Sequence, residues 1–269
     1  GTLLPAKVFY RWCPELQSAA RTRSGTPVHV QLLGSDPVCM AENAARAVEL
    51  GAPAIDLNFG CPAKTVNRHG GGAVLLDEPE RVYQVVAAVR RAVPAAIPVS
   101  AKMRLGNLDG ELALDNARGI ETAGASWLTV HGRTKSQGYR PPAFWDRIGL
   151  IRQAINLPVI ANGEIWNTED ALRCLQESGC DALMLGRGAV SDPFLAQRLR
   201  GECLQSGWPQ VLQRLKLFIT ELNGSGSDSQ VSGRVKQWLN YLRRDCSEAE
   251  VLYQQMVRLR RPDEMLALL

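Results

Sequence analysis

A repeated pattern, in which a short apolar segment is followed by a helical one, runs through the first 200 residues. Short segments rich in β-branched and apolar residues are typical of parallel strands buried on both faces. Helical periodicity follows each, and glycine or proline marks many of the boundaries. The predicted strands are 28–33, 54–58, 99–104, 127–131, 158–162 and 182–186, and the predicted helices are 36–50, 79–92, 112–123, 145–155, 168–178 and 193–200. Such a series predicts an α/β fold with a parallel sheet.

The ends of the predicted strands favour a barrel over an open, doubly wound sheet. Each strand gives way to its loop at a polar residue or glycine, namely Gln31, Asn58, Lys102, His131, Asn162 and Gly186-Arg187. An open sheet gathers its binding groups at one switch point, whereas a TIM (β/α)8 barrel draws them from all its strand ends. We therefore expect a TIM barrel. Because that barrel has eight strands, we also expect its first two strands to be missing from this chain.

The pattern changes near residue 200. Residues 201–209 are predicted to be a linker and residues 223–229 a flexible loop, and helices are expected over 211–222, 231–244, 248–260 and from Pro262 onward. We predict two domains, a barrel over residues 1–200 and a small helical bundle over residues 201–269. Residues 198–269 hold 11 Lys/Arg against 8 Asp/Glu. This excess favours a polyanion-binding surface, although a solvated helical face can also carry such an excess.

Composition excludes several classes of protein. The chain has 269 residues, of which 45% are hydrophobic and 22% charged, as in ordinary globular proteins. No signal peptide is visible at its start, and no apolar run approaches the roughly 20 residues that span a bilayer. Its seven cysteines include no CxxC pair, which argues against a disulfide framework or a zinc site. We expect a reducing, cytoplasmic location and no metal.

Cys61 lies where the second predicted strand breaks into a loop. The segment reads Asn58-Phe-Gly-Cys61-Pro, and three glycines follow at 70–72. We expect no regular structure between Cys61 and Pro79, because glycine and proline disfavour it. A thiol at a strand tip is well placed for chemistry. A free cysteine is also commonly a small buried hydrophobe, and position alone leaves both interpretations open.

The later strand ends carry further candidate residues. Gly163 and Gly186 let backbone N–H groups approach a phosphate, and Arg187 adds charge, although the same residues also suit simple turns. Lys102 ends an apolar strand, where an ammonium needs an anionic or polar ligand, or must reach solvent beyond the strand. His131 is either a buried core histidine or a ligand contact, and its position level with Lys102 favours the contact.

Several motifs together resemble the tRNA-dihydrouridine synthases in order and spacing, over nearly the whole chain. They are Asp56-Leu-Asn-Phe-Gly-Cys-Pro with the glycine triplet, Ala101-Lys-Met-Arg-Leu-Gly, Val130-His-Gly-Arg-Thr, Ala161-Asn-Gly-Glu and Gly186-Arg-Gly. Residues 11–16 and 236–242 are most similar to the bacterial C-type enzymes, which are associated with position 16 of the D-loop. One departure is that the family begins with a strand ending in an Ala-Pro-Met-like flavin contact, which this chain lacks.

The resemblance implies an FMN-dependent reduction of the uracil C5–C6 double bond in tRNA, with electrons from NADPH. The flavin N5 would deliver hydride to C6, and the Cys61 thiol would protonate C5. The implied flavin-site residues are Gln31, Lys102, His131, Asn162, Gly163, Glu164, Gly186 and Arg187. The implied substrate-binding residues are Asn58 at the target base, Arg133, and Arg234, Lys236, Arg243 and Arg244 in the helical domain. No protein partner is implied, and we expect a monomer.

Two other interpretations remain open at this point. A truncated barrel that has lost flavin and activity would leave an inactive remnant that still binds tRNA through its helical domain. Alternatively, a flavin barrel of the dihydroorotate or dihydropyrimidine dehydrogenase kind would reduce a free pyrimidine, and the basic helical domain would then be incidental.

Overall fold

The structure is a computed structural model that describes residues 2–202, 206–223 and 226–269. The predicted linker and the predicted loop therefore lie partly outside the described residues, at 203–205 and 224–225. The chain forms two compact units. One comprises Gly1–Gly163 with Arg173–Met184, and the other comprises Glu164–Leu172 with Leu185–Leu269. The predicted division into functional domains at residue 200 stays a prediction.

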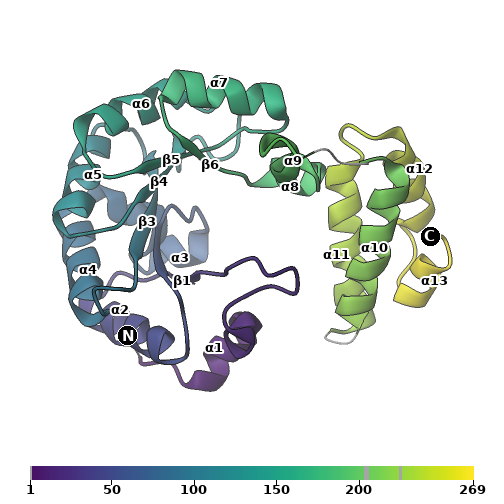
Figure 1. Ribbon diagram of the computed structural model, residues 1–269, viewed down its shortest axis with the longest axis horizontal. Helices are drawn as coiled ribbons and strands as arrows, with labels where there is room; N and C mark the ends of the chain where they lie inside the picture. The colour runs from purple at the N-terminus through teal and green to yellow at the C-terminus, as the bar shows by residue number, and fades with distance from the viewer. Residues whose placement is uncertain (1, 203–205, 224–225) are drawn as a thin grey trace. The chain divides into compact units, whose positions relative to one another are not determined.

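The first unit contains a parallel sheet of six strands (Figure 1). The strands are β1 (Val30–Leu32), β2 (Ile55–Phe59), β3 (Val99–Gly106), β4 (Leu128–Thr134), β5 (Val159–Asn162) and β6 (Ala182–Met184). They pair in sequential order from β1 to β6, without the reversal of order that defines the switch point of a doubly wound sheet. The predicted α/β fold with a parallel sheet is confirmed, and its strand order is consistent with a TIM barrel.

Helices follow the strands and cover one face of the sheet. They are α2 (Pro37–Glu49), α4 (Pro79–Ala92), α5 (Ala113–Thr122), α6 (Trp145–Ala154) and α7 (Thr168–Ser178). Figure 1 shows α2, α4, α5 and α6 along the outer side of the curved sheet. The start of α2 illustrates the local signals, because the Asp36 side chain accepts a hydrogen bond from the Cys39 N–H at 2.7 Å and Pro37 opens the helix.

The segment between Cys61 and Pro79 corrects the prediction that it lacks regular structure. It contains α3 (Lys64–Arg68) and the 3-10 helix η2 (Gly72–Asp77). The Asn67 side chain supports both, since its amide nitrogen donates to the carbonyl oxygens of Cys61 and Ala63, and its oxygen accepts from the Val74 N–H. One asparagine thus satisfies backbone groups at both ends of the loop, an effect that composition does not reveal.

Four further short elements lie outside the sheet and the helices named above. Helix α1 (Ala6–Trp12), which was not predicted, and the 3-10 helix η1 (Pro14–Ser18) precede the sheet. The single helix predicted over 193–200 is instead α9 (Leu195–Leu199), preceded by a separate α8 (Arg187–Ser191). Pro193 lies between them, where a proline disfavours a continuous helix.

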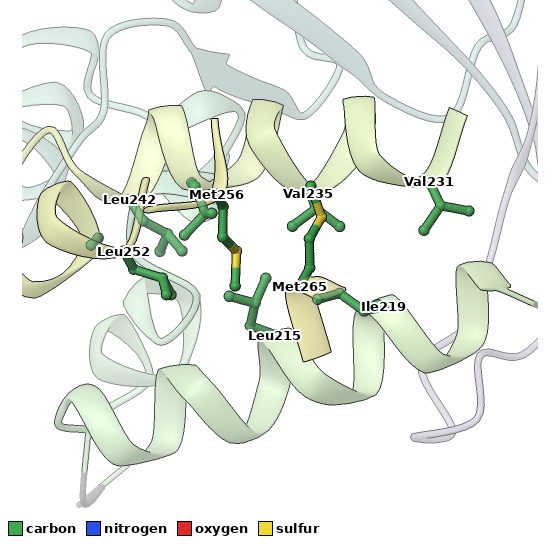
Figure 2. Packing of buried hydrophobic residues seen from close by; sticks show 10 residues of the cluster. Leu215, Ile219, Val231, Val235, Leu242, Leu252, Met256 and Met265 are labelled. Carbon is green, nitrogen blue, oxygen red and sulfur yellow. The ribbon is translucent and has the colours of Figure 1, made fainter. Parts of the chain in front are cut away.

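The second unit includes four helices around one apolar cluster (Figure 2). They are α10 (Trp208–Asn223), α11 (Asp228–Leu242), α12 (Ser247–Met256) and α13 (Pro262–Leu266). The cluster is made of Leu215, Ile219, Val231, Val235, Leu239, Leu242, Ala249, Leu252, Met256 and Met265. Buried residues recur every three or four positions along α11, which places them on one face of that helix. Among the described residues, no helix has both the length and the apolar character that a bilayer crossing requires.

Candidate active site

The parallel register brings the polar strand ends of the first unit together. Asn58 pairs with Lys102 across β2 and β3, and His131 pairs with Asn162 across β4 and β5. The Asn58 amide donates to Gln31 Oε1 at 2.8 Å, and Lys102 Nζ donates to Asn162 Oδ1 at 3.3 Å. Residues from five strands therefore contribute to one edge of the sheet, as the barrel interpretation predicted.

Asp56 is a member of this cluster that sequence reasoning missed. Its buried carboxylate accepts one hydrogen bond from Gln31 Nε2 and one from the Ser100 hydroxyl, both at 2.6 Å. Asp56 therefore fixes the orientation of the Gln31 amide. The available signal was a carboxylate inside an otherwise apolar strand, since such a group needs hydrogen-bond partners.

Lys102 is a buried ammonium in a polar setting. Its pKa is lowered from 10.5 to about 8, first by burial and then by the charge of Arg104, and Asp56 partly offsets both effects. Lys102 donates to Asn162, whose Nδ2 in turn donates to the Met184 carbonyl at 2.7 Å. That second hydrogen bond orients the Asn162 amide so that its oxygen faces the lysine. Lys102 is therefore largely buried and hydrogen-bonded within the site, and its contact with a polar ligand stays a prediction.

The lowered pKa of Lys102 predicts a pH-dependent stability. Between pH 8 and 10.5 the unfolded chain binds this proton more tightly, so the ligand-free protein gains stability as pH rises through that range. We expect Lys102→Met to be more stable than the unsubstituted chain at pH 7, by about 1–3 kcal/mol, and the difference to shrink above pH 8. Denaturant unfolding at several pH values measures this, with the exposed Lys7→Met as control. Parallel stability curves would contradict it.

His131 and Arg133 are both buried in β4. Arg133 Nη1 lies 3.4 Å from His131 Nε2, and Arg133 Nε donates to the Pro142 carbonyl at 3.0 Å. The His131 ring also packs against Gly163, whose φ is +118° and where a Cβ atom would lie 2.6 Å from His131 Cδ2. Arg133 is completely buried and contacts His131, and its expected contact with substrate stays a prediction.

The backbone around Cys61 is held on both sides. The Gly60 N–H donates to Asn58 Oδ1 at 2.9 Å, and the Gly60 carbonyl accepts from Arg104 Nε at 2.8 Å. The Cys61 carbonyl accepts from Asn67 Nδ2 at 2.9 Å and from the Ala73 N–H at 3.1 Å. The thiol itself is free and only half-buried. The backbone on both sides of the thiol is thus fixed, and the catalytic role of Cys61 stays a prediction.

Arg104 is a second residue that sequence reasoning did not single out. Its buried guanidinium donates to the carbonyl oxygens of Gly60, Thr134 and Gly138, at 2.8, 3.0 and 2.9 Å, and lies 5.4 Å from the centroid of the Tyr139 ring. Burial lowers the Arg104 pKa, and Tyr139 opposes that effect. Arg104 thus ties the Cys61 loop to the loop after β4. The signal was a second cation two residues beyond Lys102.

The second unit holds the remaining predicted flavin residues. Glu164 has a positive φ of 56°, and its carboxylate lies 3.5 Å from Arg187 Nη2. Gly186 precedes α8, and no atom lies within 4 Å of the position that a Cβ atom would take there. Arg187 and Glu164 are therefore brought together, with open space beside Gly186.

The four predicted RNA-binding residues of the helical region differ in their surroundings. Arg243 forms an ion pair with Glu250 at 3.1 Å and lies over the Tyr253 ring, and Arg244 lies over the Trp166 ring. Arg234 and Lys236, both on α11, have no hydrogen bond or ion pair within the described residues. Arg234 is exposed and Lys236 half-buried, and neither would have to give up such a partner to bind a polyanion.

The sequence as a whole is similar to those of known proteins. It matches the family described as "Dihydrouridine synthase (Dus)" over residues 2–269. It is 49% identical over 268 residues to the tRNA-dihydrouridine(16) synthase of Shewanella oneidensis, covering 99% of this chain and 85% of the relative. The enzyme of the same name from Escherichia coli K12 is 53% identical over 254 residues, covering 94% and 80%. The one from Cupriavidus necator is 51% identical over 265 residues, covering 96% and 82%.

These matches confirm the resemblance read from the motifs, including the similarity to enzymes named for position 16. The chain therefore belongs to the dihydrouridine synthase family, whose members are flavin-dependent, tRNA-modifying oxidoreductases.

Proposed function

We propose that this chain reduces uridine 16 in the D-loop of tRNA to 5,6-dihydrouridine, with FMN as its flavin and NADPH as the source of electrons. The observation that carries the proposal is the half-buried Cys61, held by backbone contacts directly after Asn58. A second support is the sequence of the chain, which is about 50% identical to enzymes named tRNA-dihydrouridine(16) synthase.

The residues that the family resemblance assigns to the flavin carry suitable polar groups. Lys102, Asn162, His131 and Gln31 offer a buried ammonium, two amides and an imidazole, which suits the polar edge of an isoalloxazine ring. Arg187, beside the open space at Gly186, suits the phosphate, with Glu164 as its ion-pair partner. Gly163, directly after β5, would offer a backbone N–H to the flavin. Bound FMN would supply the hydride that reaches C6 of the uracil.

Residues of the chain would bind the base and donate the proton. The Asn58 side-chain NH2 donates one hydrogen bond to Gln31, and its oxygen accepts one from the Gly60 N–H. One N–H and one lone pair of the amide are left for the uracil. The Cys61 thiol would donate its proton to C5 as general acid. Its loop is fixed by Asn67 and Arg104, so the donor needs little reordering when the base arrives.

The tRNA would also be bound through its phosphates. The target uridine has to leave its stack to reach the thiol, so the enzyme must hold a deformed RNA. Arg234 and Lys236 on α11 are the two cations predicted for this role that have no hydrogen bond or ion pair within the described residues. Binding through such side chains should weaken as salt increases, because RNA releases its counterions.

Reconstitution with defined substrates tests the proposal. The purified chain is given FMN, NADPH and an unmodified tRNA transcript, and dihydrouridine is mapped by position. We expect product at position 16, none in a transcript with cytidine at that position, and no reduction of free uridine. Absence of flavin binding together with absence of product would favour the inactive remnant. Reduction of free uridine or uracil would favour the small-pyrimidine enzyme.

A further inference from the structure

Two guanidinium groups stack over one tryptophan in the second unit. The half-buried Trp166 follows Glu164 in the loop before α7. Cζ of Arg187 lies 4.9 Å from the centroid of its ring, and Cζ of Arg244 lies 3.6 Å from the same centroid. Arg187 opens α8 and Arg244 comes shortly after the end of α11. One indole therefore joins two cations from distant parts of the sequence.

Glu164 links the same indole to Arg187. The Trp166 Nε1–H donates to Glu164 Oε1 at 2.7 Å, and Glu164 Oε2 lies 3.5 Å from Arg187 Nη2. The Trp166 backbone N–H donates to Asp170 Oδ2 at 3.0 Å, which holds the loop itself. Any displacement of the indole would therefore shift the positions of both groups that contact Arg187, namely the indole ring and the Glu164 carboxylate.

We propose that Arg244 is a positioning residue for Arg187, acting through Trp166, and that it is not an RNA contact. The inference rests on the proposed function, in which Arg187 binds the flavin phosphate. Arg244 is placed for this role because its guanidinium stacks closely on the ring, while its acidic neighbour Asp245 is exposed and 3.7 Å away. Leaving the ring to reach an RNA phosphate would forfeit that stacking. The chain after α11 would thereby contribute to flavin affinity.

The test compares FMN with riboflavin, which has the same ring system and no phosphate. Dissociation constants for both are measured from the change in flavin fluorescence on adding flavin-free protein. We expect Trp166→Leu and Arg244→Leu each to weaken FMN binding about three- to tenfold, the range of one cation–π contact. Riboflavin binding should be unchanged in both variants. In the double variant, FMN binding should be weakened by less than the product of the two single factors, because both substitutions remove the same contact. Arg244→Lys should recover part of the loss.

Controls separate this role from RNA binding and from general damage. Arg258→Leu removes an exposed arginine with no partner among the described residues, and should change neither flavin constant. In tRNA binding against salt, Arg234→Leu should lower the slope by about one unit, and Arg244→Leu should not. Equal weakening of FMN and riboflavin, or a lower salt slope with unchanged FMN affinity, would overturn the inference. If the unsubstituted chain binds FMN no better than riboflavin, the proposed phosphate site fails as well.

Discussion

Replacing Cys61 with alanine should lower the rate of dihydrouridine formation by about 100-fold to 10,000-fold, the range that a positioned general acid contributes. Alanine has no proton to donate, while the backbone contacts that hold the loop remain available. The Cys61 carbonyl would still accept from Asn67 and Ala73. Flavin affinity and tRNA affinity should therefore stay within about twofold. Single-turnover product formation, measured beside both dissociation constants, separates the chemical step from binding.

Cys39 provides the matched control for this substitution. It is also a free, half-buried cysteine of the first unit, but it lies on α2 and donates to the Thr2 carbonyl. Cys39→Ala should keep the full rate of product formation. If Cys61→Ala turned over unmodified tRNA at the rate of the unsubstituted chain, another group would have to supply the proton.

The strands could be predicted closely because their apolar runs are bounded by glycine, proline or polar residues. The ends of β3 and β4 were predicted too early, and for the same reason. The two strands were expected to end at Arg104 and His131 but continue to Gly106 and Thr134. A charged residue at the end of an apolar run indicates a strand terminus. Arg104 and Arg133 are instead buried within their strands, and backbone carbonyl groups from other segments satisfy them.

The candidate site could be predicted only as far as strand ends reveal it. Gln31, Asn58, Lys102, His131 and Asn162 each stand where a strand gives way to a loop, and the register brings them together. Side chains that act across the sequence left no such signal. The stacking of Arg244 on Trp166 depends on how two segments distant in the sequence pack together, and the sequence patterns do not reveal that packing.

Gly72→Ala should disturb the Cys61 loop most strongly of the glycine-triplet substitutions. Gly72 has a φ of +69°, and a Cβ atom there would lie 2.6 Å from the Cys61 carbonyl oxygen and 3.1 Å from Cys61 Cβ. Both the left-handed backbone and the close approach oppose a side chain. We expect a loss of about 2–4 kcal/mol in the free energy of unfolding. The rate of product formation should fall at least about 30-fold, because a displacement of about 1 Å can cost 100-fold.

The two neighbouring glycines separate these causes. Gly70 also has a φ of +69°, but a Cβ atom there would meet nothing closer than 3.9 Å, whereas Gly71 has an ordinary φ and a nearest atom at 3.5 Å. Gly71→Ala should be close to neutral, and Gly70→Ala should lose about 1 kcal/mol of stability with little change in rate. Denaturant unfolding and single-turnover rates of the three variants measure both quantities. If Gly70→Ala lowered the rate as much as Gly72→Ala, backbone strain rather than contact with Cys61 would control the loop, and the thiol would not need the close packing that we assign to it.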